Sequence, residues 1–138
     1  MAPTIRLDII TPERTLLQEP VEMLVAPAID GEIGVLKGHF PLVTALQIGP
    51  LRFRREGEEK WVLMAVSGEG IMEVLPDRVS ILAGAAEFQH EIDVERAKQA
   101  RERAEKRLNG KDDKANMTRA EAALQRALNR LRIAKYMD

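Results

Sequence analysis

The chain of 138 residues contains no cysteine, and only 4% of its residues are aromatic. The absence of cysteine excludes disulfides, a thiolate nucleophile and cysteine-based zinc sites, and it suits a reducing compartment. The shortage of aromatic residues means that any core must be built from valine, isoleucine, leucine and methionine. No stretch approaches the roughly 20 apolar residues that span a bilayer. Residues 1–8 lack the apolar run of a secretory signal, so we expect neither membrane insertion nor a signal peptide.

Motifs of the common enzyme classes are also missing. The sequence has no P-loop pattern, and Gly68-Glu-Gly70 is too short for a dinucleotide fingerprint. The two histidines, His39 and His90, lie far apart in the sequence, and no metal-ligand spacing is present. These absences predict a protein with no catalytic residues and no metal site, which is an interaction protein rather than an enzyme.

Charge divides the chain into two parts. Residues 1–90 hold 8 basic and 13 acidic residues, whereas residues 91–138 hold 13 basic and 9 acidic residues. The near-neutral total of −1 therefore hides an acidic front part and a basic rear part. Such an asymmetry is typical of proteins that work by docking on a partner.

The front part has the pattern of short β-strands. Apolar residues alternate with polar ones at the start, and glycine, proline and aspartate separate the later segments. The predicted strands are 4–9, 14–18, 21–25, 32–36, 43–46, 51–55, 61–66, 71–75 and 79–82. Turns at intervals of about 8–12 residues predict a sandwich or a flattened barrel. Mixed runs of valine, isoleucine and leucine indicate that some strands are covered on both faces.

The rear part changes to helical periodicity. Asp93 is a good N-cap and Asn109-Gly110 a good stop, which predicts a helix over 93–108. A capping-box pattern from Thr118 to Glu121 predicts a second helix over 118–136, after a polar loop at 111–114. Both helices present alanine-rich stripes, so the pair forms an antiparallel hairpin. A buried methyl group contributes only about 0.8 kcal/mol, so we expect this hairpin to be nearly balanced between packed and open states.

Four arginines of the predicted hairpin fall at matching distances from its loop. Arg96 and Arg103 lie two turns apart on one helix face, and Arg126 and Arg130 lie one turn apart on the other helix. Folding the hairpin brings these guanidinium groups together, and guanidinium suits bidentate contact with phosphate. The plainer alternative is that they form a solvated helix face. Asp93 and Glu87 are placed to accept hydrogen bonds from a base or sugar beside them.

Several segments resemble the epsilon subunit of bacterial F-type rotary ATP synthase. The stretch from Gly31 to Thr44, GEIGVLKGHFPLVT, is similar to a signature loop of that subunit, as is Gly49-Pro-Leu-Arg that follows it. The segments IDVERA (92–97) and RALNRL (126–131) resemble its nucleotide-binding elements. The resemblance covers nearly the whole chain, although Lys37 stands where the family often has proline.

This resemblance implies an α+β fold with a ten-stranded β-sandwich, or flattened barrel, and a C-terminal antiparallel helical hairpin. It divides the chain into a rotor-docking sandwich at 1–87 and a regulatory hairpin at 88–138. It further implies a central-stalk position between the gamma subunit and the c-ring of the proton- or sodium-translocating synthase. The turn at Asp30, Gly31 and Glu32 matches the ring contact, with Glu32 favoured. His39 matches the gamma-facing surface, although a structural turn histidine is an equal alternative.

The resemblance also implies regulation. An extended hairpin is expected to reach the catalytic alpha and beta subunits and to inhibit ATP hydrolysis, whereas bound ATP is expected to favour the folded hairpin. No obligatory cofactor is expected, and ATP is a possible regulatory ligand. We expect a peripheral protein at the cytoplasmic face of the bacterial plasma membrane. The predicted nucleotide-binding residues are Glu87, Ile92, Asp93, Arg96, Ala97, Arg103, Arg126 and Arg130.

Two other classes of function fit parts of the pattern. A stand-alone nucleotide sensor would bind ATP without a gamma-like partner. A nucleic-acid-binding module would use the basic second helix, where residues 114–138 hold six basic and two acidic residues. That helix lacks stacking aromatic residues apart from Tyr136, so we expect no nucleic-acid partner.

Overall fold

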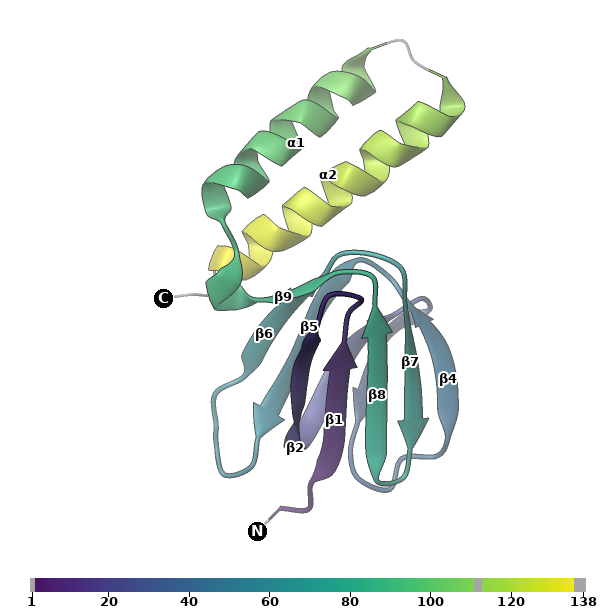
Figure 1. Ribbon diagram of the computed structural model, residues 1–138, viewed down its shortest axis with the longest axis vertical. Coiled ribbons are helices and arrows are strands. Elements are labelled where there is room, and N and C mark those ends of the chain that lie inside the picture. The colour runs from purple at the N-terminus through teal and green to yellow at the C-terminus, as the bar shows by residue number, and fades with distance from the viewer. Residues whose placement is uncertain (1, 111–112, 136–138) are drawn as a thin grey trace.

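The computed structural model describes residues 2–110 and 113–135, and it shows a β-sandwich with a helical hairpin standing at one end (Figure 1). Nine strands are present in the described residues, where the resemblance implies ten. The predicted fold class is confirmed. The strands are β1 Ile5–Ile10, β2 Thr15–Ala28, β3 Gly31–Val35, β4 Leu42–Leu46, β5 Gly49–Arg55, β6 Val62–Val66, β7 Gly70–Leu75, β8 Arg78–Ala83 and β9 Ala86–Phe88. A 3₁₀ turn at Gln89–Glu91 leads to α1, Val94–Asn109, and then to α2, Lys114–Ala134.

The strands form a sheet that closes on itself. The order is β1-β8-β7-β4-β2-β5-β6-β9, and β1 also pairs with β2. Only the β1–β8 pair is parallel among the strand pairs of the described residues. Inside the sandwich lie the large apolar side chains, with Ile5, Leu7, Phe53 and Met64 fully buried. This interior is separate from the small apolar cluster beneath the hairpin.

Two strands differ from the sequence prediction. The predicted strands at 14–18 and 21–25 are one continuous strand, β2, of 14 residues. Its first half pairs with β1 and its second half with β3 and β5, and its register with β5 shifts between Val21 and Met23. The polar interruption at Glu19-Pro20 still pairs with β1, and the partner changes to β5 at the next residue, Val21. The short strand β9 was not predicted, and the division proposed between residues 87 and 88 falls inside it.

The helix ends follow their aspartate caps. The Asp93 side chain accepts a hydrogen bond from the Arg96 backbone N–H at 3.1 Å, as predicted. Helix α2 begins at Lys114, four residues before the predicted start, because Asp113 is its N-cap. Thr118 lies inside this helix, where its hydroxyl donates to the Lys114 carbonyl at 2.9 Å, so the capping box was wrong. The predicted end at residue 136 lies outside the described residues.

Alanines form the contact between the two helices. Ala97 and Ala104 of α1 and Ala120 and Ala127 of α2 are each buried to 3% exposure or less. Their small side chains let the two helix backbones approach closely. Within the described part of the chain, no helix is long and apolar enough to cross a membrane.

Candidate functional site

A cleft of about 400 Å³ lies where the hairpin meets the last strand of the sandwich. Strand β9 and the 3₁₀ turn supply one wall, and both helices supply the rest. Six of the eight residues predicted to bind nucleotide line this cleft. The lining residues are Glu87, Glu91, Asp93, Arg96, Ala97, Ala100, Arg103 and Arg130.

An ion pair closes one side of the cleft. Glu87 of β9 accepts a hydrogen bond from the Arg130 guanidinium of α2, and both side chains are about two-thirds buried or more. The pair joins the sandwich to the second helix. Because Glu87 balances Arg130, that arginine is partly neutralised before any ligand binds.

Two carboxylates of the cleft are held by local hydrogen bonds. Asp93 is engaged in capping α1. Glu91 accepts from the Phe88 backbone N–H at 3.0 Å and from the Arg14 guanidinium at 2.7 Å. These bonds lower the pKa of Glu91 below its usual 4.5, with the backbone bond the larger cause. Glu91 is therefore an anion at neutral pH, and it is directed to Arg14 rather than to a ligand.

Two arginines of the cleft remain available to bind an anion. Arg96 and Arg103 are exposed on one face of α1, as their spacing predicted. Neither takes part in an ion pair within the described residues. Their guanidinium groups are free to contact an anion in the cleft, where three acidic side chains also lie.

Two predicted nucleotide residues do not line the cleft. Ile92 is only 7% exposed and packs with Ala65 and Ile133 beneath the hairpin. Arg126 is half-buried one helical turn before Arg130, towards the loop between the helices, and it is not among the lining residues. The sequence missed Glu91 and Ala100. Glu91 sits on the 3₁₀ turn, which has no strong pattern, whereas Ala100 follows Ala97 on the predicted stripe.

The predicted ring contact is an exposed tight turn. Asp30 and Glu32 are exposed, and Gly31 has a φ of 128°, a backbone conformation that favours glycine. Glu32 also borders a pocket with Trp61 of the sandwich and Arg132 of α2. The Trp61 ring lies 5.1 Å from the Arg52 guanidinium and 5.3 Å from that of Arg54.

His39 occupies the turn between β3 and β4. Its Nδ1 lies 2.7 Å from the Phe40 carbonyl oxygen, and its ring stacks on the Phe40 ring with centroids 4.5 Å apart. The neighbouring Gly38 has a φ of 89°. These contacts agree with the structural alternative for His39, and they leave its exposed neighbour Phe40 as an apolar contact point.

An exposed apolar face on β4, β7 and β8 was not located from the sequence. Val43, Ile71 and Leu82 are 66%, 52% and 54% exposed. Ala45 pairs with Ile71 and Ile71 with Leu82, so one apolar row crosses the three strands, whereas Val43 lies opposite Glu73 at the edge of this row. The mixed apolar runs predicted strands covered on both faces, yet this face is open here. Exposed apolar faces of this kind mark interaction surfaces.

Comparison with known proteins assigns the family. Residues 4–89 match the family described as ATP synthase, Delta/Epsilon chain, beta-sandwich domain. Residues 90–135 match its companion, the long alpha-helix domain. The chain belongs to the ATP synthase delta/epsilon family. The resemblance seen in the sequence is thereby confirmed over almost the whole chain.

Close relatives of this family member are epsilon chains of bacterial ATP synthases. The chain is 50% identical to that of Desulforamulus reducens, over 98% of this chain and all of the relative. It is 52% identical to that of Syntrophobacter fumaroxidans, over 98% of each. The epsilon chain is a stalk subunit rather than a catalytic subunit, so the prediction of a non-catalytic role is confirmed by kinship.

Solved structures of the family give the same shape. A chain in the Euglena gracilis mitochondrial ATP synthase, from a structure of its OSCP/F1/c-ring part, is 31% identical with a TM-score of 0.78. The match covers 91% of this chain and 78% of that one. A chain from the central stalk and c-ring of Tetrahymena thermophila shares the fold, with a TM-score of 0.63 at 14% identity. Chains with this fold thus occur in ATP synthase assemblies.

Proposed function

We propose that this chain docks on the rotor of an ATP synthase through its sandwich and restrains ATP hydrolysis through a hairpin that folds and extends. The observation that carries this proposal is the smallness of the seam between hairpin and sandwich. Among the described residues, the cluster there has just three buried members, Ala65, Ile92 and Ile133, with Leu63 and Ala134 at its edge. A hairpin that stays permanently attached to the sandwich would need a larger interface.

A few hydrogen bonds complete the seam. The buried Asn129 side chain donates to the Gly49 carbonyl at 2.9 Å and more weakly to the Val66 carbonyl at 3.4 Å. Gln89 donates to the Ile133 carbonyl at 2.7 Å. Such bonds contribute about 0.5–1.5 kcal/mol each, and burial of one isoleucine contributes about 1.5–3 kcal/mol. With two isoleucines, these hydrogen bonds and the Glu87–Arg130 ion pair, the gross gain is roughly 5–10 kcal/mol, from which the entropy cost of ordering the hairpin is subtracted.

A ligand can shift a balance of that size. ATP in the cleft of Arg96 and Arg103 would contact both helices and β9 together, and this combination exists only in the folded hairpin. If ATP binds that state alone, it adds about 2.7 kcal/mol at a hundredfold excess over Kd. A high ATP concentration would keep the hairpin folded, so that ATP hydrolysis is not inhibited. A low ATP concentration would release the hairpin.

The docking surfaces follow from exposure and charge. The apolar face of Val43, Ile71 and Leu82 suits the gamma subunit, which would cover it. The turn at Asp30–Glu32 suits polar loops of the c-ring. The released helix α2 carries basic residues suited to an acidic surface on the alpha and beta subunits, where charge sets docking rate and register. The protein would work as a peripheral subunit at the cytoplasmic face of the bacterial plasma membrane.

Calorimetric titration with ATP tests the sensor. Arg103→Ala should weaken ATP binding about tenfold, because it removes a charge-assisted contact. Lys106→Ala is the matched control, since Lys106 is an exposed cation on the same helix outside the cleft. Absence of heat with the unaltered chain, or equal loss in both variants, would remove the sensor. The docking proposal would survive that result.

A further inference from the structure

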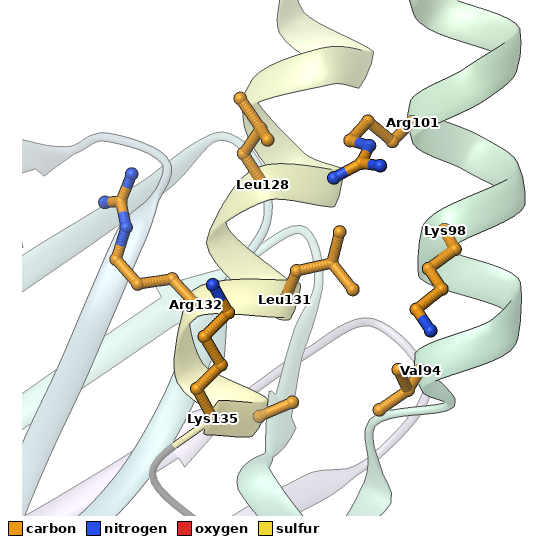
Figure 2. Close-up of a pocket in the computed structure, with 8 residues that line it drawn as sticks. Val94, Lys98, Arg101, Leu128, Leu131, Arg132 and Lys135 are labelled. Carbon is orange, nitrogen blue, oxygen red and sulfur yellow. The ribbon is translucent and has the colours of Figure 1, made fainter.

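A second cleft lies between the two helices, on the edge of the hairpin that carries no sandwich residue (Figure 2). It has a volume of about 490 Å³, within the range of small-molecule sites. All of its lining comes from the hairpin. The lining residues are Val94, Lys98, Arg101, Leu128, Leu131, Arg132, Ala134 and Lys135.

The two clefts differ in charge. The candidate nucleotide cleft mixes three carboxylates with three arginines. The lining of the second cleft has four cationic residues and no acidic one among the described residues, and Figure 2 shows the guanidinium of one of them, Arg132, directed away from α1. The nearest acids are exposed partners on α1, with Glu95 3.7 Å from Lys98 and Glu105 3.4 Å from Arg101. A single anion is the ligand charge that this lining favours.

Apolar side chains form the rest of the second cleft. Figure 2 shows Leu131 of α2 directed towards α1, with Val94 on the facing helix. The guanidinium of Arg101 points into the gap between the helices. Its Nε atom lies 3.4 Å from the exposed Glu105 carboxylate on the same helix, an ion pair that water screens. A carboxylate placed in the gap would add charge-assisted contacts to this guanidinium, whose shape suits carboxylate oxygens.

We infer that this second cleft binds an amphipathic anion, a free fatty-acid carboxylate, with its head at the basic rim and its hydrocarbon chain against Val94, Leu128 and Leu131. The ligand contacts both helices, so it binds the folded hairpin and holds it closed. This inference rests on the folded hairpin of the proposed function, but it needs no nucleotide. The cell would then have a second, lipid-derived signal acting on the same arm.

Octanoate, a soluble short fatty acid, is the probe for this site. In methyl NMR spectra, octanoate should shift the resonances of Val94, Leu128 and Leu131, and it should slow hydrogen exchange in both helices. Acetate lacks the chain and 1-octanol lacks the charge, so both should bind at least about tenfold more weakly. Equal binding of 1-octanol, or shifts spread over the exposed sandwich face at Val43, would overturn the inference.

Paired variants locate the carboxylate. The double variant Lys98→Gln, Arg101→Gln should weaken octanoate binding about tenfold or more. The control Lys106→Gln, Arg107→Gln removes the same charge from the last turn of α1, outside both clefts. Equal affinity in the two variants would contradict the assignment. The octanoate experiments contain no ATP, so a negative result in them does not contradict the nucleotide proposal. Likewise, a negative ATP titration does not contradict the fatty-acid proposal.

Vesicles distinguish a free fatty acid from a membrane surface. Phosphatidylglycerol vesicles should not bind the chain more tightly than phosphatidylcholine vesicles, since the cleft takes one detached chain. Binding to phosphatidylglycerol vesicles without any binding of octanoate would show a membrane contact instead and would overturn the inference.

Discussion

The sandwich and the hairpin bury apolar surface in opposite ways. The sandwich fills its interior with large side chains from many strands, among them Phe53, Met64 and Ile5. The hairpin closes on alanines and rests on the sandwich through a cluster around Ile133. Large buried side chains give a permanent structure, whereas methyl groups give an interface that a ligand or a partner can reverse. This difference fits the proposed function, in which the sandwich stays docked and the hairpin is released.

Removing a large core side chain should produce the greatest effect. Phe53→Ala should lower the free energy of unfolding by about 3–5 kcal/mol, because it leaves a cavity inside the sandwich. Chemical denaturation followed by far-UV circular dichroism measures this loss. A loss of stability no larger than that of a hairpin variant would contradict the contrast between the sandwich and the hairpin.

Asn129→Ala should weaken the contact of the hairpin with the sandwich and leave the sandwich folded. The change leaves the Gly49 and Val66 carbonyls without this donor, at a cost of about 1–3 kcal/mol. Hydrogen exchange should accelerate in α2 and stay unchanged in β1 and β8. Gln125→Ala, an exposed position on the same helix, is the control. Uniform acceleration through the sandwich would show that the two regions unfold together.

A charge on the exposed apolar face should affect docking rather than folding. Val43 is 66% exposed and lies opposite Glu73, so Val43→Asp should lower the free energy of unfolding by no more than about 1 kcal/mol, through repulsion between the two carboxylates. Co-purification with a gamma-like partner from detergent-solubilised membranes should be lost. Thr15→Asp, an exposed position at the start of β2, is the control. Retention of the partner by the Val43 variant would place the docking surface elsewhere.

The smallest effect should come from Glu91. Its pKa is lowered in the folded chain, so its contribution to stability is complete above the unfolded value near 4.5. That contribution is lost as the pH falls through the lower, folded pKa. Glu91→Gln removes this titrating group. Below about pH 5, the free energy of unfolding of the variant should therefore fall less steeply with decreasing pH than that of the unaltered chain. The effect is small because the group is exposed, and an unchanged acid profile would contradict it.

The sequence predicted the features that local periodicity controls. Asp93 is a cap because its type and position before an apolar stripe are sufficient signals. Arg96, Arg103 and Arg130 share the cleft because helical spacing and the position of the loop decide which faces meet. Arg126 does not line the cleft, although Arg103, which is nearer the loop on the facing helix, does. Counting residues from the loop cannot show which side of α2 the cleft follows.

Features that depend on distant partners escaped prediction. Asn129 reads as a surface residue on a helix, and only its acceptors on Gly49 and Val66 explain its burial. Strand β9 has three residues, too few for a pattern, and it is defined by pairing with β6. Thr118 matched a capping box, but Asp113 offered an earlier cap that the polar run obscured.

The position of Trp61 gives the molecule its own optical probe. It is the single tryptophan of the chain, and its ring lies beside two arginines in the pocket that Arg132 and Ile133 of α2 complete. If the hairpin opens as proposed, the indole would gain water on that side, and its emission should move to longer wavelength. Stopped-flow fluorescence of the unlabelled protein would therefore time each opening and closing directly.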